Sequence, residues 1–263
     1  MKGFRFKALL LLNLVLFCTL ATLKAHACQL RSVWEPYPPY QYLDDKGQIR
    51  GLDIELLEAV ANAANCRIIF QHLPWKRGLA LLSKGLIDVG SGASKTKARS
   101  EYAHFSVPYR DEAMSIYVQR KPFRPIQFNT LNQLANSPAH VGVVIGYSYG
   151  DKFSKLRSTQ AFKGKVSEVL SDSLNIQKLM AGRIDVILIE QFGGAQLIDQ
   201  VPSHHKSIKR HPLKVKTGDI HFLFSKASVS ETRLKHFNDA LQTIKNNGQY
   251  QKIMESYLNV NRD

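Results

Sequence analysis

The sequence predicts an α/β protein of two lobes, each a mainly parallel sheet flanked by helices, with two strands joining the lobes. Two observations support this prediction. Short apolar strands alternate with amphipathic helices, which is typical of βαβ units around a parallel sheet. A helix end followed by a glycine and a strand start also occurs twice, at Leu81 to Val89 and at Lys178 to Val186. The second copy indicates a second α/β unit.

The composition is that of a globular protein. Of the 263 residues, 44% are hydrophobic and 22% are charged, which excludes disordered and collagen-like chains. Residues 1–27 have the form of a secretory signal peptide, with a basic start, an apolar run from Ala8 to Leu23 and an Ala25-His26-Ala27 cleavage site. The run is shorter than the roughly 18 residues that span a bilayer. We therefore expect a soluble mature protein that is exported to the periplasm and begins at Cys28.

The mature chain is basic, because removal of residues 1–27 lowers the net charge only from +15 to +11. The densest basic cluster, residues 206–216, lacks the interleaved aromatic residues of a single-strand binder. An exported protein also has little access to nucleic acid, so no nucleic-acid partner is expected. The excess charge fits a solvated basic face, an anionic ligand or an anionic surface.

Two cysteines, Cys28 and Cys66, remain in the mature chain in an oxidising compartment. Each opens a predicted strand, and neighbouring parallel strands that start at one sheet edge can bring the two close enough for a disulfide. The alternative is a lipid anchor on Cys28, which directly follows the cleavage site. Ala25 and His26 fit a lipobox poorly, which favours the disulfide.

Strands and helices alternate in both units. In the first unit we expect strands at 29–34, 67–72 and 87–91 and helices at 53–64 and 75–83. In the second unit we expect strands at 141–145, 165–169 and 186–189 and helices at 149–157, 173–181 and 191–198. After these come a strand at 221–224 and two helices broken at Asn247-Gly248, which complete the first unit.

Two crossings between the units follow from this order. A strand at 115–118 and the basic, proline-containing segment 120–125 mark the first crossing, and residues 211–218 mark the second. Lobe 1 comprises residues 28–118 and 219–263, and lobe 2 comprises residues 119–218, with hinge crossings near 119–121 and 213–218.

Aromatic and polar residues follow the strands of the first lobe, at the edge where both sheets would face one cleft. Tyr37 lies in a proline-rich loop, where it either faces a ligand or caps the core, whereas Trp34 is assigned to the core. Gly92, Ser94 and Arg99 form a turn whose N–H groups, hydroxyl and guanidinium suit a carboxylate. The alternative for Arg99 is a surface residue or an ion pair.

The second lobe offers a comparable set. Ser148 lies in a turn after a strand and can supply a hydroxyl. Glu190 ends an apolar strand, where it would meet a ligand ammonium or sit at a helix start. The chain lacks His-Glu-x-x-His, Walker A and Cys-x-x-Cys motifs, and no catalytic residue and no cofactor are expected. A metal site at the adjacent pair His204-His205 is not expected either.

Seven segments together resemble the periplasmic solute-binding proteins of polar amino acid uptake, family 3. They are Pro38–Tyr42, Gly51–Leu56, Gly85–Asp88, Ser94–Arg99, Phe105–Tyr109, Gly182–Asp185 and Asn247–Tyr250. Pro74–Leu79 resembles a branch of the family whose helix begins with Pro-Trp-x-Arg. The resemblance covers nearly the whole mature chain, and it implies a type 2 periplasmic binding fold that closes on one ligand.

The resemblance also implies residue roles. Tyr37 and Trp75 are walls for the ligand, and Ser94 and Arg99 bind its α-carboxylate. From the second lobe, Ser148 adds a hydroxyl and Glu190 takes the α-ammonium. Two departures leave the side-chain specificity open. The family usually has Asp where this chain has Glu190, and some members have Ser where it has Gly92.

The implied function is capture of an amino acid or a similar small zwitterion by a monomer that delivers it to an ABC permease in the inner membrane, without catalysis. Two alternatives remain. An exported dehydratase acting on prephenate or arogenate can use this fold, with Glu190 as a general acid. A binding protein that serves a separate sensor can use it as well.

Overall fold

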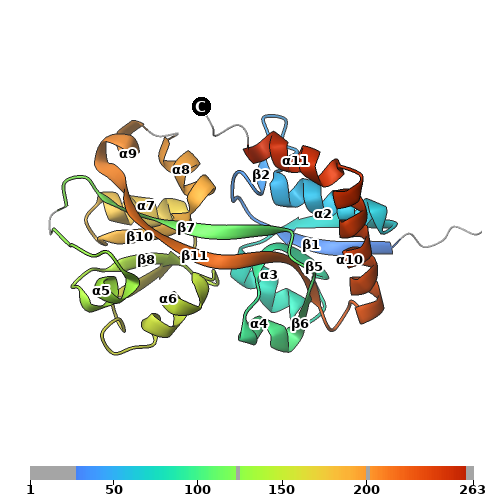
Figure 1. The fold of residues 1–263 in the computed structure, drawn as a ribbon, viewed down its shortest axis with the longest axis horizontal. Helices are drawn as coiled ribbons and strands as arrows, with labels where there is room; N and C mark the ends of the chain where they lie inside the picture. The colour runs from blue at the N-terminus through green and yellow to red at the C-terminus, as the bar shows by residue number, and fades with distance from the viewer. Residues whose placement is uncertain (1–27, 123–124, 200–201, 259–263) are drawn as a thin grey trace, which may run out of the picture.

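The computed structural model describes residues 28–122, 125–199 and 202–258 and shows two lobes joined by two long strands (Figure 1). The predicted signal peptide, residues 1–27, lies outside the described residues. Within the described residues, no helix is both long and apolar enough to cross a membrane.

The first lobe is formed by the N-terminal part of the chain and by its two last helices (Figure 1). Its strands are β1 (Cys28–Trp34), β4 (Cys66–His72), β5 (Val89–Ser94) and β6 (Ala103–Phe105), with a hairpin of β2 (Tyr42–Leu43) and β3 (Ile49–Arg50). Its helices are α2 (Leu52–Ala63), α3 (Trp75–Leu82), α4 (Lys97–Tyr102), α10 (Glu231–Asn246) and α11 (Gln249–Leu258).

The second lobe is formed by the middle of the chain. Its strands are β8 (Val141–Val144), β9 (Val166–Val169) and β10 (Val186–Glu190). Its helices are α5 (Leu131–Asn136), α6 (Gly150–Arg157), α7 (Asp172–Met180), α8 (Gln191–Asp199) and α9 (Pro202–Ser207). The connecting strands β7 (Arg110–Gln119) and β11 (Ile208–Ser225) run side by side from one lobe to the other (Figure 1).

The sheet follows the order β4-β1-β5-β11-β7-β10-β8-β9, so it continues through both lobes. The outer three strands on each side are parallel to one another, and β5 and β10 meet the connecting strands in antiparallel pairs. This confirms the α/β fold with parallel sheets flanked by helices. Because parallel strands end at the same sheet edge, the loops after β1 and β5 meet those after β8 and β10 between the lobes.

Apolar periodicity explains how the helices cover the sheet. In α2 the buried positions include Leu52, Leu56, Leu57 and Val60, which pack in one core with Phe237 and Leu241 of α10. Four helices, α4, α5, α7 and α10, begin at side-chain caps; in α7, for example, the Ser171 hydroxyl accepts the N–H of Leu174. The C-terminal helices therefore complete the first lobe, as the sequence predicts.

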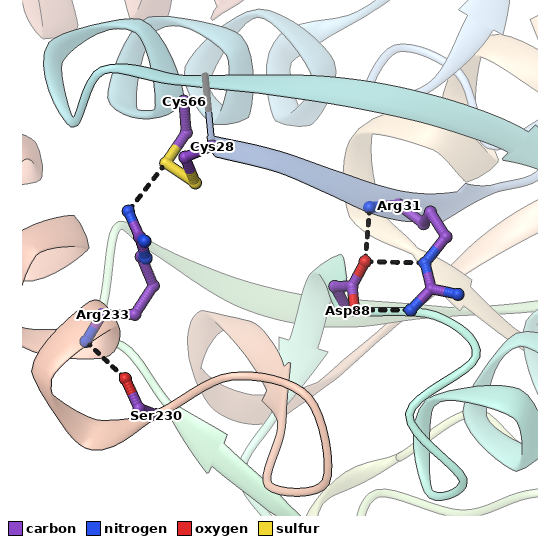
Figure 2. The surroundings of a disulfide bond; sticks show 6 residues. All are labelled: Cys28, Arg31, Cys66, Asp88, Ser230 and Arg233. Atoms are coloured by element: carbon purple, nitrogen blue, oxygen red, sulfur yellow. Dashed lines mark hydrogen bonds and ion pairs between the residues drawn. A yellow bond between two sulfur atoms is a disulfide. The ribbon is translucent and has the colours of Figure 1, made fainter. Parts of the chain in front are cut away.

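The repeated glycine-to-strand construction has the same function in both lobes. In the first lobe Asp88 accepts the backbone N–H of Arg31 at 2.8 Å and the Arg31 guanidinium through both of its oxygens (Figure 2). In the second lobe Asp185 accepts the backbone N–H of His140 at 2.8 Å. Asp88 thus ties the start of β5 to the middle of β1, and Asp185 ties the start of β10 to the residue that precedes β8.

Cys28 and Cys66 form a disulfide, as predicted (Figure 2). They are register partners at the start of the parallel strands β1 and β4, with their Cα atoms 4.4 Å apart. The Arg233 guanidinium of α10 lies 3.5 Å from the Cys66 sulfur. The disulfide therefore closes the outer edge of the first lobe, away from the loops that face the second lobe.

The connecting strands are longer than the sequence predicts. A strand at 115–118 is expected, whereas β7 runs from Arg110 to Gln119, and β11 extends the expected 221–224 strand back to Ile208. From Met114 to Val118, β7 pairs with β10 of the second lobe. The lobe boundaries themselves remain a prediction. Residues 123–124 of the basic segment lie outside the described residues.

Candidate functional site

A small cavity lies between the lobes. Most residues that line it come from the first lobe, from the loop after β1, the start of α3 and the β5–α4 segment. A smaller group comes from β7 and from the loop after β8 in the second lobe. The lining residues are Glu35, Tyr37, Gln41, Trp75, Ser91, Gly92, Ser94, Arg99, Glu112, Met114, Tyr147 and Ser148. The cavity is therefore built mostly by the first lobe and is covered by the second.

Most of the predicted site residues come together in this cavity. Six of them line it, namely Tyr37, Trp75, Gly92, Ser94, Arg99 and Ser148. The seventh, Glu190, is 1% exposed at the end of β10 and does not line the cavity. Trp34 is buried beside the His72 ring, at a centroid distance of 4.8 Å, in agreement with its assignment to the core.

Arg99 lies on the first turn of α4, which begins after the Thr96 cap. Its side chain is buried, and its two terminal nitrogens donate to the backbone oxygens of Ser94, at 2.7 Å, and Gly146, at 2.9 Å. The second of these bonds joins the two lobes. Burial lowers the pKa of Arg99, yet the described residues place no carboxylate within ion-pair distance of it. A buried guanidinium in this situation suits an incoming carboxylate.

The Gly92 backbone differs from its expected role. Its N–H donates to the Tyr109 hydroxyl at 2.8 Å and is therefore already engaged. The residue has a φ of 77°, and an added Cβ would lie 3.0 Å from an Asp53 carboxylate oxygen. A serine at this position would thus meet both backbone strain and crowding.

Three aromatic rings form the walls of the cavity. Tyr37 and Tyr147 meet edge to face with centroids 5.6 Å apart, although they belong to different lobes. Trp75 is the first residue of α3, and the centroid of its ring lies 5.7 Å from the Arg99 guanidinium carbon. Tyr147 was not singled out in the sequence, although it directly precedes Ser148.

Glu35 is a cavity residue that the sequence analysis did not select. One of its carboxylate oxygens accepts the Tyr147 hydroxyl at 2.7 Å, and the other accepts the Trp75 backbone N–H at 2.8 Å. Burial raises the pKa of Glu35 despite these two bonds. The residue therefore connects two walls of the cavity, one from each lobe.

Glu112 is the second cavity acid that the sequence did not reveal. It lies on β7, opposite Gly218 of β11, and is 7% exposed. Its carboxylate contacts the Arg110 guanidinium at 3.4 Å and accepts the Thr217 hydroxyl at 3.2 Å. Burial raises the pKa of Glu112, which Arg110 opposes. A usable signal was the spacing of Arg110 and Glu112, because two residues apart in a strand share one face.

Glu190 and Asp172 are two further buried acids of the second lobe. One Glu190 oxygen accepts the N–H groups of Phe192 and Gly193 at the start of α8, and the other has no partner among the described residues. Burial raises the pKa of Glu190 to about 7. Burial, together with the nearby Glu35, Glu190 and Glu112, likewise raises the pKa of Asp172 to about 7. The region next to the cavity is therefore rich in acids.

The lobes approach closely around the cavity. A Cβ added at Gly193 of α8 would lie 2.6 Å from the Pro38 carbonyl oxygen of the first lobe. A Cβ added at Gly146 would lie 3.3 Å from the Lys76 side chain. Together with the bonds from Arg99 to Gly146 and from Tyr147 to Glu35, these contacts describe a closed arrangement.

No group of three or more His, Cys, Asp or Glu is placed to hold a metal ion within residues 28–122, 125–199 and 202–258. The side chains of His204 and His205 lie outside this description.

Comparison with known families identifies this architecture. Residues 31–260 match the family of bacterial extracellular solute-binding proteins, family 3. The chain belongs to this family. It is thus a solute-binding protein and not an enzyme, and the family is extracellular or periplasmic. The match does not separate the Pro-Trp-x-Arg branch from the rest of the family.

Two curated family 3 relatives illustrate the similarity. The chain is 28% identical to the "Probable histidine-binding protein" of Neisseria gonorrhoeae over 225 residues, which cover 84% of this chain and 80% of that protein. It is 26% identical to the "Arginine-binding periplasmic protein" of Mannheimia haemolytica, covering 86% of this chain and 90% of that protein. A solved ancestral arginine-binding protein bound to arginine has a TM-score of 0.75 and 25% identity, covering 88% and 98% of the two chains.

Proposed function

We propose that this solute-binding protein captures an amino acid or a similar small zwitterion between its lobes and delivers it to an ABC permease of the inner membrane. The observation that carries the proposal is Arg99, a buried guanidinium that lines the cavity and has no acidic partner among the described residues. The named ligands of similar proteins, histidine, arginine and L-cystine, support an amino acid.

In this proposal each end of the zwitterion has its own contacts. Arg99 and the Ser94 hydroxyl bind the α-carboxylate, and Gly92 leaves room beside it. Ser148 of the cavity lining adds a hydroxyl. Glu190 does not line the cavity of this closed form, and its unpartnered oxygen takes the α-ammonium once the ligand widens the cavity toward the end of β10. Tyr37 and Trp75 are the walls. Closure removes the ligand from water, which strengthens these charged contacts.

The exported state of the protein fits the same proposal. We infer that residues 1–27 are a signal peptide cleaved after Ala27 and that the mature chain acts as a monomer in the periplasm. The Cys28 sulfur is bonded to Cys66, so it cannot at the same time carry the thioether of a lipid anchor. This supports a freely diffusing protein over a lipid-anchored one.

Replacement of Arg99 tests the site. Arg99→Ala is expected to weaken binding of the best amino acid ligand by about 100-fold or more, because a desolvated charge pair is lost. Isothermal titration calorimetry with the mature protein measures the effect, after a thermal-unfolding screen of all common amino acids and cystine identifies that ligand. Arg67→Ala, an exposed arginine of β4 in the same lobe, is the control. Wild-type affinity in Arg99→Ala would contradict the site.

A further inference from the structure

The positive charge of the mature chain is concentrated in one part of it. Residues 119–218, the predicted second lobe, hold 15 Lys and Arg but only 6 Asp and Glu, so they carry +9 of the net charge of +11. The rest of the mature chain carries only +2. Ligand capture does not require this difference, because Arg99 is the one Lys or Arg among the described residues that line the cavity.

The two lobes also differ in where their acids lie. In the first lobe, ion pairs with carboxylates hold four of the bases, namely Arg31, Arg50, Arg110 and Lys235. In the second lobe, two of the six acids, Asp172 and Glu190, are buried and cannot neutralise charge at the surface. Glu168 is already paired with Arg157, at 3.0 Å. Few carboxylates are therefore left to balance the other bases of the second lobe.

Exposed bases gather along β11 and at the outer end of β7. They are Lys121, Lys206, Lys209, Arg210, Lys214 and Lys216, and we call them the basic stripe. Over its second-lobe part β11 is an edge strand, since its pairing with β5 begins only at Ile220. The Arg120 N–H donates to the Ser207 carbonyl at 2.8 Å, which places Lys121 beside the start of β11. None of the six side chains is in an ion pair or a hydrogen bond with another described residue.

The basic stripe offers charge without an apolar centre. The exposed large hydrophobic residues of the described chain are Leu43, Leu86, Val107, Leu170 and Leu174, none of which lies on β7 or β11. A stable interface with another protein needs apolar anchors at its centre and buries more than about 1,000 Å². Five of the six bases are lysines, which are flexible point charges rather than oriented forks. They suit a partner that presents many negative charges over a plane, as the phosphates of an anionic phospholipid membrane do.

We propose that the basic stripe holds the protein reversibly on the anionic phospholipid surface of the inner membrane, by attraction between its Lys and Arg side chains and the lipid phosphates. This goes beyond ligand capture and does not depend on which solute is bound, because none of the six residues lines the cavity. From Lys209 to Lys216 the strand is roughly 20 Å long, so it can meet several headgroups at once. A protein held in this way searches for its permease in the plane of the membrane rather than through the volume of the periplasm.

Sedimentation with lipid vesicles tests the proposal on the mature protein, residues 28–263. Vesicles of phosphatidylcholine alone are compared, at low salt, with vesicles that contain about 30% phosphatidylglycerol. We expect binding to the anionic vesicles only and its loss at about 0.5 M NaCl, because salt screens exposed charges. Glycerol 3-phosphate, added at equal ionic strength, should not compete, since it presents a single phosphate and no charged plane.

Two variants that lose the same charge separate the stripe from the net charge. The stripe variant is Lys209→Gln/Arg210→Gln/Lys214→Gln/Lys216→Gln, and it is expected to bind anionic vesicles at least about 30-fold more weakly. The control also replaces three Lys and one Arg, which are exposed in the first lobe, namely Arg67→Gln/Lys84→Gln/Lys97→Gln/Lys252→Gln. It should stay within about threefold of wild type, because charges far from the contact are screened. Circular dichroism and thermal unfolding of both variants confirm that they are folded.

Several results would overturn the proposal. An equal loss in both variants, or full binding by the stripe variant, would show that the stripe is not the contact. Binding to phosphatidylcholine vesicles, no binding to anionic vesicles at low salt, or full competition by glycerol 3-phosphate would show that an anionic membrane is not the partner.

Discussion

The two lobes share one plan but are stabilised differently. In the first lobe the strand order is β4-β1-β5, and in the second it is β9-β8-β10, with the earliest strand in the centre both times. The third strand of each lobe then meets a connecting strand in an antiparallel pair. Both loops after the central strands, those after β1 and β8, bring tyrosines to the cavity. The helix end, glycine and strand start that occur twice in the sequence thus belong to a structural unit that also occurs twice.

The difference lies in their buried polar groups. The first lobe has the disulfide, and its buried aspartates Asp53 and Asp88 are paired with arginines. Among the described residues, the buried side-chain polar atoms without a partner belong to Ser115 of β7 and to Asp172, Asn175 and Glu190 of the second lobe. We infer that the first lobe is the fixed wall of the site and that the second holds polar groups whose state depends on pH and ligand.

Removal of the disulfide should have the largest effect and should fall on the first lobe. A Cys28→Ser/Cys66→Ser variant is expected to lose about 2–5 kcal/mol of unfolding free energy, because the unfolded chain regains the freedom of the loop between the two residues. Urea denaturation measures the loss, and hydrogen exchange locates it. Faster exchange in β1 and β4 with unchanged exchange in β8 and β10 is the expected pattern, and equal change in both lobes would contradict the comparison.

Asp172 should make the stability of the second lobe depend on pH. Its folded-state pKa of about 7 lies above the ordinary 3.8, so between these values the folded protein holds a proton that the unfolded chain has released. The contribution of this residue therefore falls as pH rises through that window, by up to about 1.4 kcal/mol per pH unit, and stays low above it. Asp172→Asn should flatten the fall and be more stable than wild type at pH 8.

Urea denaturation of both proteins between pH 4 and pH 8 measures this difference. Asp151→Asn serves as the control, since Asp151 also lies in the first turn of a second-lobe helix but is exposed. If the Asp172→Asn and wild-type profiles stay parallel across the whole range, the buried carboxyl is not the cause.

Tyr147 should show the smallest effect, on the contact between the lobes. Tyr147→Phe removes the hydroxyl that Glu35 accepts and is expected to weaken ligand binding by roughly three- to tenfold, with little change in unfolding free energy. Tyr149→Phe is the matched opposite, because the Tyr149 hydroxyl accepts the buried Val144 N–H within one lobe. It should cost about 1–2 kcal/mol of stability and leave affinity unchanged. Calorimetry measures the ligand affinity of both variants, and urea denaturation measures their stability. A loss of stability in Tyr147→Phe with a loss of affinity in Tyr149→Phe would contradict these roles.

The sequence predicted the elements whose signal is local. Short apolar strands, such as β4 and β8, and helices with an apolar face were placed to within one or two residues. The connecting strands were underestimated, because Arg110 to Glu112 and Lys209 to Lys216 are polar and strand pairing between distant segments stabilises them. A hydrophobic pattern depends on the residues of one element, so it carries no information about the hydrogen bonds that a partner strand adds.

The site divides in the same way. The predicted residues that line the cavity follow strands or begin helices, and such positions can be recognised from the local sequence pattern. They are Tyr37, Trp75, Ser94, Arg99 and Ser148. Glu35 and Tyr147 are 112 positions apart and become a pair only when the lobes meet. Glu112 contacts Arg110 and receives the Thr217 hydroxyl only because β7 pairs with β11, more than 100 positions further along the chain. These roles depend on contacts between distant segments, which a linear pattern does not contain.

Gly193 gives the closed arrangement a sharp steric limit. Since a single methyl group there would press against the Pro38 carbonyl, a residue with any side chain would act as a wedge between α8 and the loop after β1. Such a wedge would hold the two halves apart whether or not the cavity is filled. A one-carbon change beside Glu190 would thus leave a binding protein that cannot close on its ligand.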